Sequence, residues 1–85
     1  KPFPDPYLRA AQMLGVDIAR CVVIEDSPTG MRSAIASGAA TVGVSHMVSL
    51  EGTGAHVLWP TLAGRSVDDL SAVLADFTAQ REQRK

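Results

Sequence analysis

The stretch that decides the fold is residues 21–30, which read CVVIEDSPTG. Its first four residues form an unbroken apolar run that is rich in β-branched side chains, and two acids follow at once. A short run without polar alternation is typical of a strand that is buried on both faces, as in a parallel sheet. Ser27 followed by Pro28 indicates the start of a helix, because a serine hydroxyl caps the first turn and proline suits the first helical position.

The same helix signals recur on both sides of this stretch. Asp5 is expected to cap a helix that has Pro6 at its first position and ends at Gly15, since glycine readily adopts the left-handed conformation that stops a helix. Gly38 is expected to end the helix that begins at Ser27. The apolar residues of the first helix recur at helical spacing: Tyr7, Ala10, Ala11 and Leu14.

Downstream, residues 41–44 and 56–59 predict two further strands, with a loop over residues 45–55. Ser66 and Asp69 resemble a capping box and predict a last helix with an apolar face. Alternating helices and strands predict an α/β fold, a partial Rossmann-like parallel sheet of about three strands with flanking helices. Such sheets bind ligands just beyond the carboxyl ends of their strands, so the residues that follow Ile24 are the first place to look for a site.

Composition limits the classes of function. A chain of 85 residues with 46% hydrophobic residues and a net charge of −1 predicts one small domain and no binding of nucleic acid or of a membrane surface. The single cysteine, Cys21, and the absence of an export signal favour a reducing, cytoplasmic compartment. His46 and His56 lack the spacing of zinc ligands and are expected to be solvated or loop histidines.

The acidic pair Glu25 and Asp26 has two interpretations. Like charges crowded at the mouth of a sheet favour a hard cation such as Mg²⁺, which takes one or two carboxylates together with phosphate and water. Alternatively, one acid caps the following helix and the other is merely solvated. Ser27 already fills the capping role, which weighs against the second interpretation.

Five motifs in order resemble a known family: residues 1–7 (KPFPDPY), 14–16 (LGV), 22–30 (VVIEDSPTG), 36–38 (ASG) and 41–44 (TVGV). Together they resemble the C-terminal half of a haloacid dehalogenase-like hydrolase core, in the subgroup of phosphoglycolate phosphatases and β-phosphoglucomutases. The resemblance covers about residues 1–45, and the remainder adds a compatible strand and helix.

The resemblance implies a role for each matching residue. Lys1 matches a catalytic lysine that neutralises charge on the phosphoryl group. Asp26 matches an acid that binds Mg²⁺, and Glu25 matches its acidic neighbour at the metal site. We assign Ser27 as support for the phosphate site, although helix capping explains it equally well. The implied activity is a Mg²⁺-dependent phosphatase for small phosphorylated metabolites that acts through a phospho-aspartate, with a phosphomutase as the alternative.

The chain departs from the family pattern in one respect. It contains no Asp-x-Asp, the motif that supplies the nucleophile, and it contains no cap domain. We therefore expect the 85 residues to be inactive alone and to expose a strand edge, through which they self-associate or pair with an N-terminal segment. A non-catalytic scaffold or interaction remnant is the other functional hypothesis. A receiver domain ranks last, because no strand here offers a phospho-acceptor.

Overall fold

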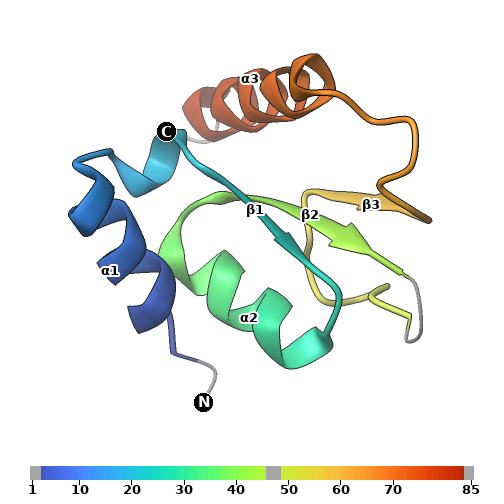
Figure 1. The fold of residues 1–85 in the computed structure, drawn as a ribbon, viewed down its shortest axis with the longest axis horizontal. Coiled ribbons are helices and arrows are strands. Elements are labelled where there is room, and N and C mark those ends of the chain that lie inside the picture. The colour runs from blue at the N-terminus through green and yellow to red at the C-terminus, as the bar shows by residue number, and fades with distance from the viewer. Residues whose placement is uncertain (1–2, 46–48, 84–85) are drawn as a thin grey trace.

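The chain forms a three-stranded parallel sheet with helices on both faces (Figure 1). The computed structural model describes residues 3–45 and 49–83. The strands are β1 (Val22–Glu25), β2 (Ala40–Val44) and β3 (Val57–Trp59), in the spatial order β1-β2-β3. The predicted α/β class and the parallel sheet are both confirmed.

Helices α1 (Asp5–Leu14) and α2 (Pro28–Ser37) lie on one side of the sheet, and α3 (Val67–Gln83) covers the other (Figure 1). A short 3-10 turn, η1 (Ile18–Arg20), leads into β1 and was not expected from the sequence. The Asp17 side chain caps this turn by accepting from the Ala19 backbone N–H at 3.0 Å. Among the described helices, none is both long and apolar enough to cross a bilayer.

Most predicted helix ends are confirmed. Ser27 caps α2 by accepting from the Gly30 N–H at 3.0 Å, and Gly38 ends the helix at φ 92°. Ser66 and Asp69 form the reciprocal pair of a capping box: the Ser66 N–H donates to Asp69 Oδ2 at 2.9 Å, and the Asp69 N–H donates to Ser66 Oγ at 3.3 Å. Each bond satisfies a donor that the start of a helix leaves unpaired.

The prediction that Asp5 caps α1 is wrong. Pro4 occupies the cap position and makes no capping bond through its side chain, and Asp5 is the first residue of the helix. Asp5 still places a negative charge in the first turn, where the helix dipole favours it. The far end is as expected, because Gly15 ends α1 in the left-handed conformation at φ 71°.

The core lies around β2, whose residues Ala40 and Val42 are fully buried. On the α3 face, the apolar stripe of α3 packs against this strand and against Trp59: Leu70, Val73, Leu74 and Phe77. On the α2 face, Met31 and Leu50 are fully buried.

Strand β1 departs from the prediction that it is buried on both faces. Its residues are only partly buried, and Ile24 is 38% exposed. The physical reason is its position, since β1 lies at the edge of the sheet formed by the described residues and pairs with β2 alone. An apolar strand that is left at an edge exposes both side chains and unpaired backbone groups.

Candidate functional site

The acidic pair lies at the carboxyl end of β1, the place where parallel sheets bind their ligands. Glu25 is the last residue of the strand, and Asp26 follows with an exposed side chain. A groove of ≈ 370 Å³ opens there between the ends of β1 and β2. Its lining combines the two acids with three apolar residues: Ile24, Val44 and Leu62.

Both oxygens of the Glu25 carboxylate accept hydrogen bonds from other residues of the chain. The Tyr7 hydroxyl of α1 donates to Oε2 at 2.6 Å. The other oxygen, Oε1, accepts from the Asp26 N–H at 3.1 Å, the Ser27 N–H at 3.4 Å and the Ser27 hydroxyl at 3.3 Å. Glu25 therefore joins α1, the end of β1 and the start of α2.

These contacts set the charge state of both partners. Burial alone raises the pKa of Glu25, but the hydrogen bonds from Tyr7, Asp26 and Ser27 favour the anion and hold the pKa below its ordinary value. Burial, the hydrogen bond to Glu25 and the charge of Glu25 together raise the pKa of Tyr7 to about 12. At neutral pH the pair is consequently a carboxylate that accepts from a neutral phenol.

Ser27 uses both sides of its hydroxyl within this network. It donates to Glu25 and accepts from the Gly30 N–H. The predicted cap by Ser27 is confirmed, and Glu25 also has a structural role, because its carboxylate accepts from the backbone and the hydroxyl of the capping serine. A role for Ser27 at a phosphate site stays a prediction.

Asp26 differs from its neighbour. Within residues 3–45 and 49–83, its carboxylate makes no hydrogen bond and faces solvent. Lys1, the predicted catalytic lysine, lies outside the described residues.

The donor set at this edge fits a hard cation through Asp26. No group of three or more His, Cys, Asp or Glu side chains in the described part of the chain is arranged to hold a metal ion. Magnesium does not require such a cage, because it is usually held by one or two carboxylates plus water and phosphate. Among the residues that the structure describes, none bonds to the Asp26 carboxylate, whereas Glu25 would have to give up its bond to Tyr7 in order to offer a second carboxylate.

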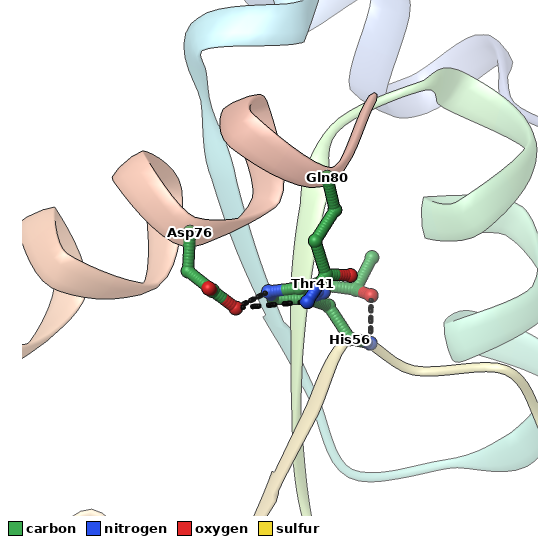
Figure 2. A network of polar contacts seen from close by, with 4 residues as sticks. All are labelled: Thr41, His56, Asp76 and Gln80. Carbon is green, nitrogen blue, oxygen red and sulfur yellow. Dashed lines mark hydrogen bonds and ion pairs between the residues drawn. The ribbon is translucent and has the colours of Figure 1, made fainter. Parts of the chain in front are cut away.

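A second polar cluster, shown in Figure 2, lies near the amino ends of β2 and β3. His56 Nε2 lies 3.0 Å from Asp76 Oδ2, and the His56 N–H donates to Thr41 Oγ1 at 2.9 Å. The His56 side chain is only 10% exposed and meets the Phe77 ring edge-on. His56 therefore lies in a loop, as one of the two expectations for it stated, but its side chain is largely shielded from solvent. No local sequence pattern indicates the cluster, because it depends on how α3 packs across the sheet.

Comparison with known proteins gives matches in one family. The haloacid dehalogenase-like hydrolase family matches residues 1–38. Hexitol phosphatase A of Escherichia coli is 47% identical over 45 residues, which are 53% of this chain and 21% of that protein. Beta-phosphoglucomutase of Bacillus subtilis is 38% identical over 74 residues, which are 87% of this chain and 30% of that protein.

A solved structure extends the likeness to the fold. A family IA, variant 3 haloacid dehalogenase-type hydrolase from Entamoeba histolytica superposes with a TM-score of 0.78 at 30% identity. The match covers 88% of this chain and 35% of that one. The chain thus spans roughly a fifth to a third of the relatives described here.

Fold and site together define a class, the α/β proteins that present acids at the carboxyl edge of a parallel sheet flanked by helices. Within that class, the matched motifs and the superposed structure identify the family. The chain belongs to the haloacid dehalogenase-like hydrolases, as the resemblance drawn from the sequence indicated.

Proposed function

We propose that the protein carrying this chain is a Mg²⁺-dependent phosphatase for small phosphorylated metabolites, to which the chain contributes the metal-binding carboxylate of Asp26. One observation carries the proposal. Asp26 directly follows β1, its carboxylate is exposed and makes no hydrogen bond among the described residues, and it lines the groove at the carboxyl edge of the sheet. The similarity to a named phosphatase supports the reaction type.

The residues of the chain prepare this edge for an anionic substrate. Asp26 holds the cation, and Glu25 fixes the turn that carries Asp26 by accepting from its backbone N–H. Ile24, Val44 and Leu62 form the apolar part of the groove lining. When bound, Mg²⁺ supplies positive charge that offsets the charge of a phosphoryl group. Lys1 adds a second positive charge in this proposal.

The covalent step requires a nucleophile. The 85 residues contain no Asp-x-Asp, so the aspartate that would accept the phosphoryl group comes, in this proposal, from another segment. Phosphoryl transfer depends mainly on positioning and on compensation of charge, and these are the tasks that the proposal assigns to the present residues. We also propose a cytoplasmic location.

A phosphomutase is the second candidate, because beta-phosphoglucomutase of Bacillus subtilis matches 87% of the chain. The two activities differ in their products. A phosphatase releases inorganic phosphate, whereas a mutase returns an isomeric sugar phosphate. Product analysis with a panel of sugar phosphates separates them.

The test compares the full-length protein with two variants that change the same residue type. Asp26→Asn should lower kcat/KM for the best sugar phosphate by more than about 100-fold, since even the outer-shell partners of metal ligands are worth about 10–100-fold. Asp68→Asn, at an exposed position in the first turn of α3, serves as the control and should behave as wild type. Equal rates for the two variants would overturn the proposal.

A further inference from the structure

The two oxygens of the Glu25 carboxylate have different partners. Oε1 accepts from the N–H groups of Asp26 and Ser27 and from the Ser27 hydroxyl. These donors belong to the turn that directly follows β1. Oε2 accepts from the Tyr7 hydroxyl at 2.6 Å, and this donor comes from α1, 18 residues earlier in the chain. Among the described contacts of Glu25, the bond at Oε2 is thus the one that joins α1 to the end of β1.

The two acids therefore differ in how readily they meet a cation. The Asp26 carboxylate is exposed and accepts no hydrogen bond from residues 3–45 or 49–83. Glu25 is its neighbour in sequence, so a cation at Asp26 lies close to Glu25, whose oxygens both have donors. A cation at Oε1 would displace three donors, two of which are backbone N–H groups. A cation at Oε2 displaces a single side-chain hydroxyl and leaves the turn intact.

Close packing limits the other movements of this carboxylate. A Cβ added at Gly30 would overlap the Glu25 carboxyl group, so the carboxylate rests directly on the first turn of α2. The Ser27 hydroxyl, which accepts from the Gly30 N–H to cap this turn, also donates to Oε1. Because α2 supports one side of the carboxylate and the turn holds Oε1, the contact that can be exchanged is the one with Tyr7.

We propose that the Tyr7 hydroxyl and the cation compete for Oε2 of Glu25, so that Tyr7 holds this carboxylate in the metal-free protein and releases it when Glu25 joins Asp26 at the cation. The inference rests on the proposed function, because it concerns the same metal site. Tyr7 is a positioning residue, since it acts on the site through Glu25. In the exchange, the cation replaces the hydroxyl proton as the partner of Oε2, and the hydroxyl donates to water instead.

Competition has two consequences of definite sign. Hydrogen bonds to an ionised group are roughly twice as strong as bonds between neutral groups, so the bond from Tyr7 opposes cation binding and its removal tightens binding. By reciprocity, a bound cation weakens the link between α1 and the end of β1. A residue that oriented Glu25 for the metal would act in the opposite direction, because loss of such a partner weakens metal binding by about 10–100-fold.

The test uses the full-length protein that carries this chain and measures its Kd for Mg²⁺ by isothermal titration calorimetry. Tyr7→Phe, which removes the hydroxyl alone, should lower the Kd by about tenfold, the lower end of what a hydrogen bond to a charged group is worth. Gln12→Ala, at an exposed position of the same helix, is the control and should leave the Kd unchanged. An unchanged or higher Kd for Tyr7→Phe would overturn the proposal.

Crystal structures of the wild-type protein with and without Mg²⁺ provide a second measurement, which decides the question if Tyr7→Phe does not fold. The metal-free structure should keep the bond of 2.6 Å between the Tyr7 hydroxyl and Glu25 Oε2. With Mg²⁺ bound, the same two oxygens should lie more than about 3.5 Å apart, beyond hydrogen-bonding distance. A metal-bound structure in which the short bond persists would show that the two partners do not compete.

The same experiments separate this inference from the proposed function. If the wild-type protein binds Mg²⁺, Asp26→Asn does not, and the bond from Tyr7 to Glu25 persists in the complex, the proposed metal site stands and the competition is wrong. If the wild-type protein binds no Mg²⁺, the proposed function and this inference both fail.

Discussion

His56 Nε2 lies 3.0 Å from Asp76 Oδ2, and this contact joins the residue before β3 to the middle of α3 (Figure 2). The two ends of the pair differ in environment, because the His56 side chain is 10% exposed and the Asp76 side chain is 62% exposed. Gln80, one turn later in α3, also donates to Asp76 Oδ2 at 3.3 Å. The cluster holds α3 against the end of the sheet that lies opposite the acidic edge.

This geometry predicts a modest coupling between His56 and Asp76. A double-mutant cycle with His56→Ala and Asp76→Ala should give an interaction free energy of about 0.5–1 kcal/mol, because one partner is exposed to water. Urea unfolding followed by circular dichroism measures it. Pairing His56→Ala with Asp68→Ala, on the same helix, provides the control cycle and should give no coupling. A coupling of zero in the first cycle would show that the contact contributes nothing to stability.

At alkaline pH, the free energy of unfolding should depend on the hydrogen bond between Tyr7 and Glu25. The pKa of Tyr7 is raised to about 12, so the folded state favours the protonated phenol. This contribution to stability is complete below the ordinary pKa of 10.0 and is lost as the pH rises towards about 12. The chain has a single tyrosine, so absorbance at 295 nm reads the residue directly. A folded chain that titrates at the same pH as the urea-unfolded chain would contradict this prediction.

At acid pH, the free energy of unfolding should depend on the ionisation of Glu25. Its pKa is lowered in the folded state by hydrogen bonds that outweigh the effect of burial, so the folded state favours the carboxylate. The contribution is therefore complete above the ordinary pKa of 4.5 and is lost as the pH falls through the lower, folded value. In a plot of the free energy of unfolding against pH, Glu25→Gln should reduce the slope of the acid limb. Glu51→Gln, at an exposed residue, is the control and should leave that limb unchanged.

The features that sequence predicted correctly are local ones. Ser27, Gly38 and the pair of Ser66 and Asp69 act within a few residues of their own positions, so spacing along the chain is sufficient to find them. The cap of α1 was misplaced by one residue, because Pro4 and Asp5 both suit the start of a helix.

The features that sequence reasoning missed depend on packing between elements. Tyr7 and Glu25 are 18 residues apart, and His56 and Asp76 are 20 apart. The presence of two adjacent acids was visible, but the bond from Tyr7 to Glu25 was not, because it depends on the approach of α1 to the end of β1. The exposure of Ile24 was likewise missed, since it depends on which strand, if any, lies beside β1.

The isolated 85 residues should not hydrolyse a generic aryl phosphate in the presence of Mg²⁺. The chain carries the proposed metal carboxylate, but it contains no Asp-x-Asp to accept the phosphoryl group. Release of p-nitrophenol from p-nitrophenyl phosphate, followed by absorbance, measures the activity of the purified chain. Turnover that persists in pure protein and disappears in Asp26→Asn would show that the nucleophile lies within these residues.

The edge of β1 should make the isolated chain self-associate. Strand β1 pairs only with β2 among the described residues, and Ile24 at this edge is 38% exposed, so another copy can add its own strand there. Sedimentation velocity should show a concentration-dependent dimer or larger species. Ile24→Lys should shift the chain towards monomer, because a charge on an edge strand opposes pairing. Val67→Lys, which places the same charge at a 76% exposed residue of α3, should leave association unchanged. A monomer at all concentrations, with a single cooperative melt, would contradict this prediction. It would show that the exposed edge of β1 does not cause copies of the chain to associate.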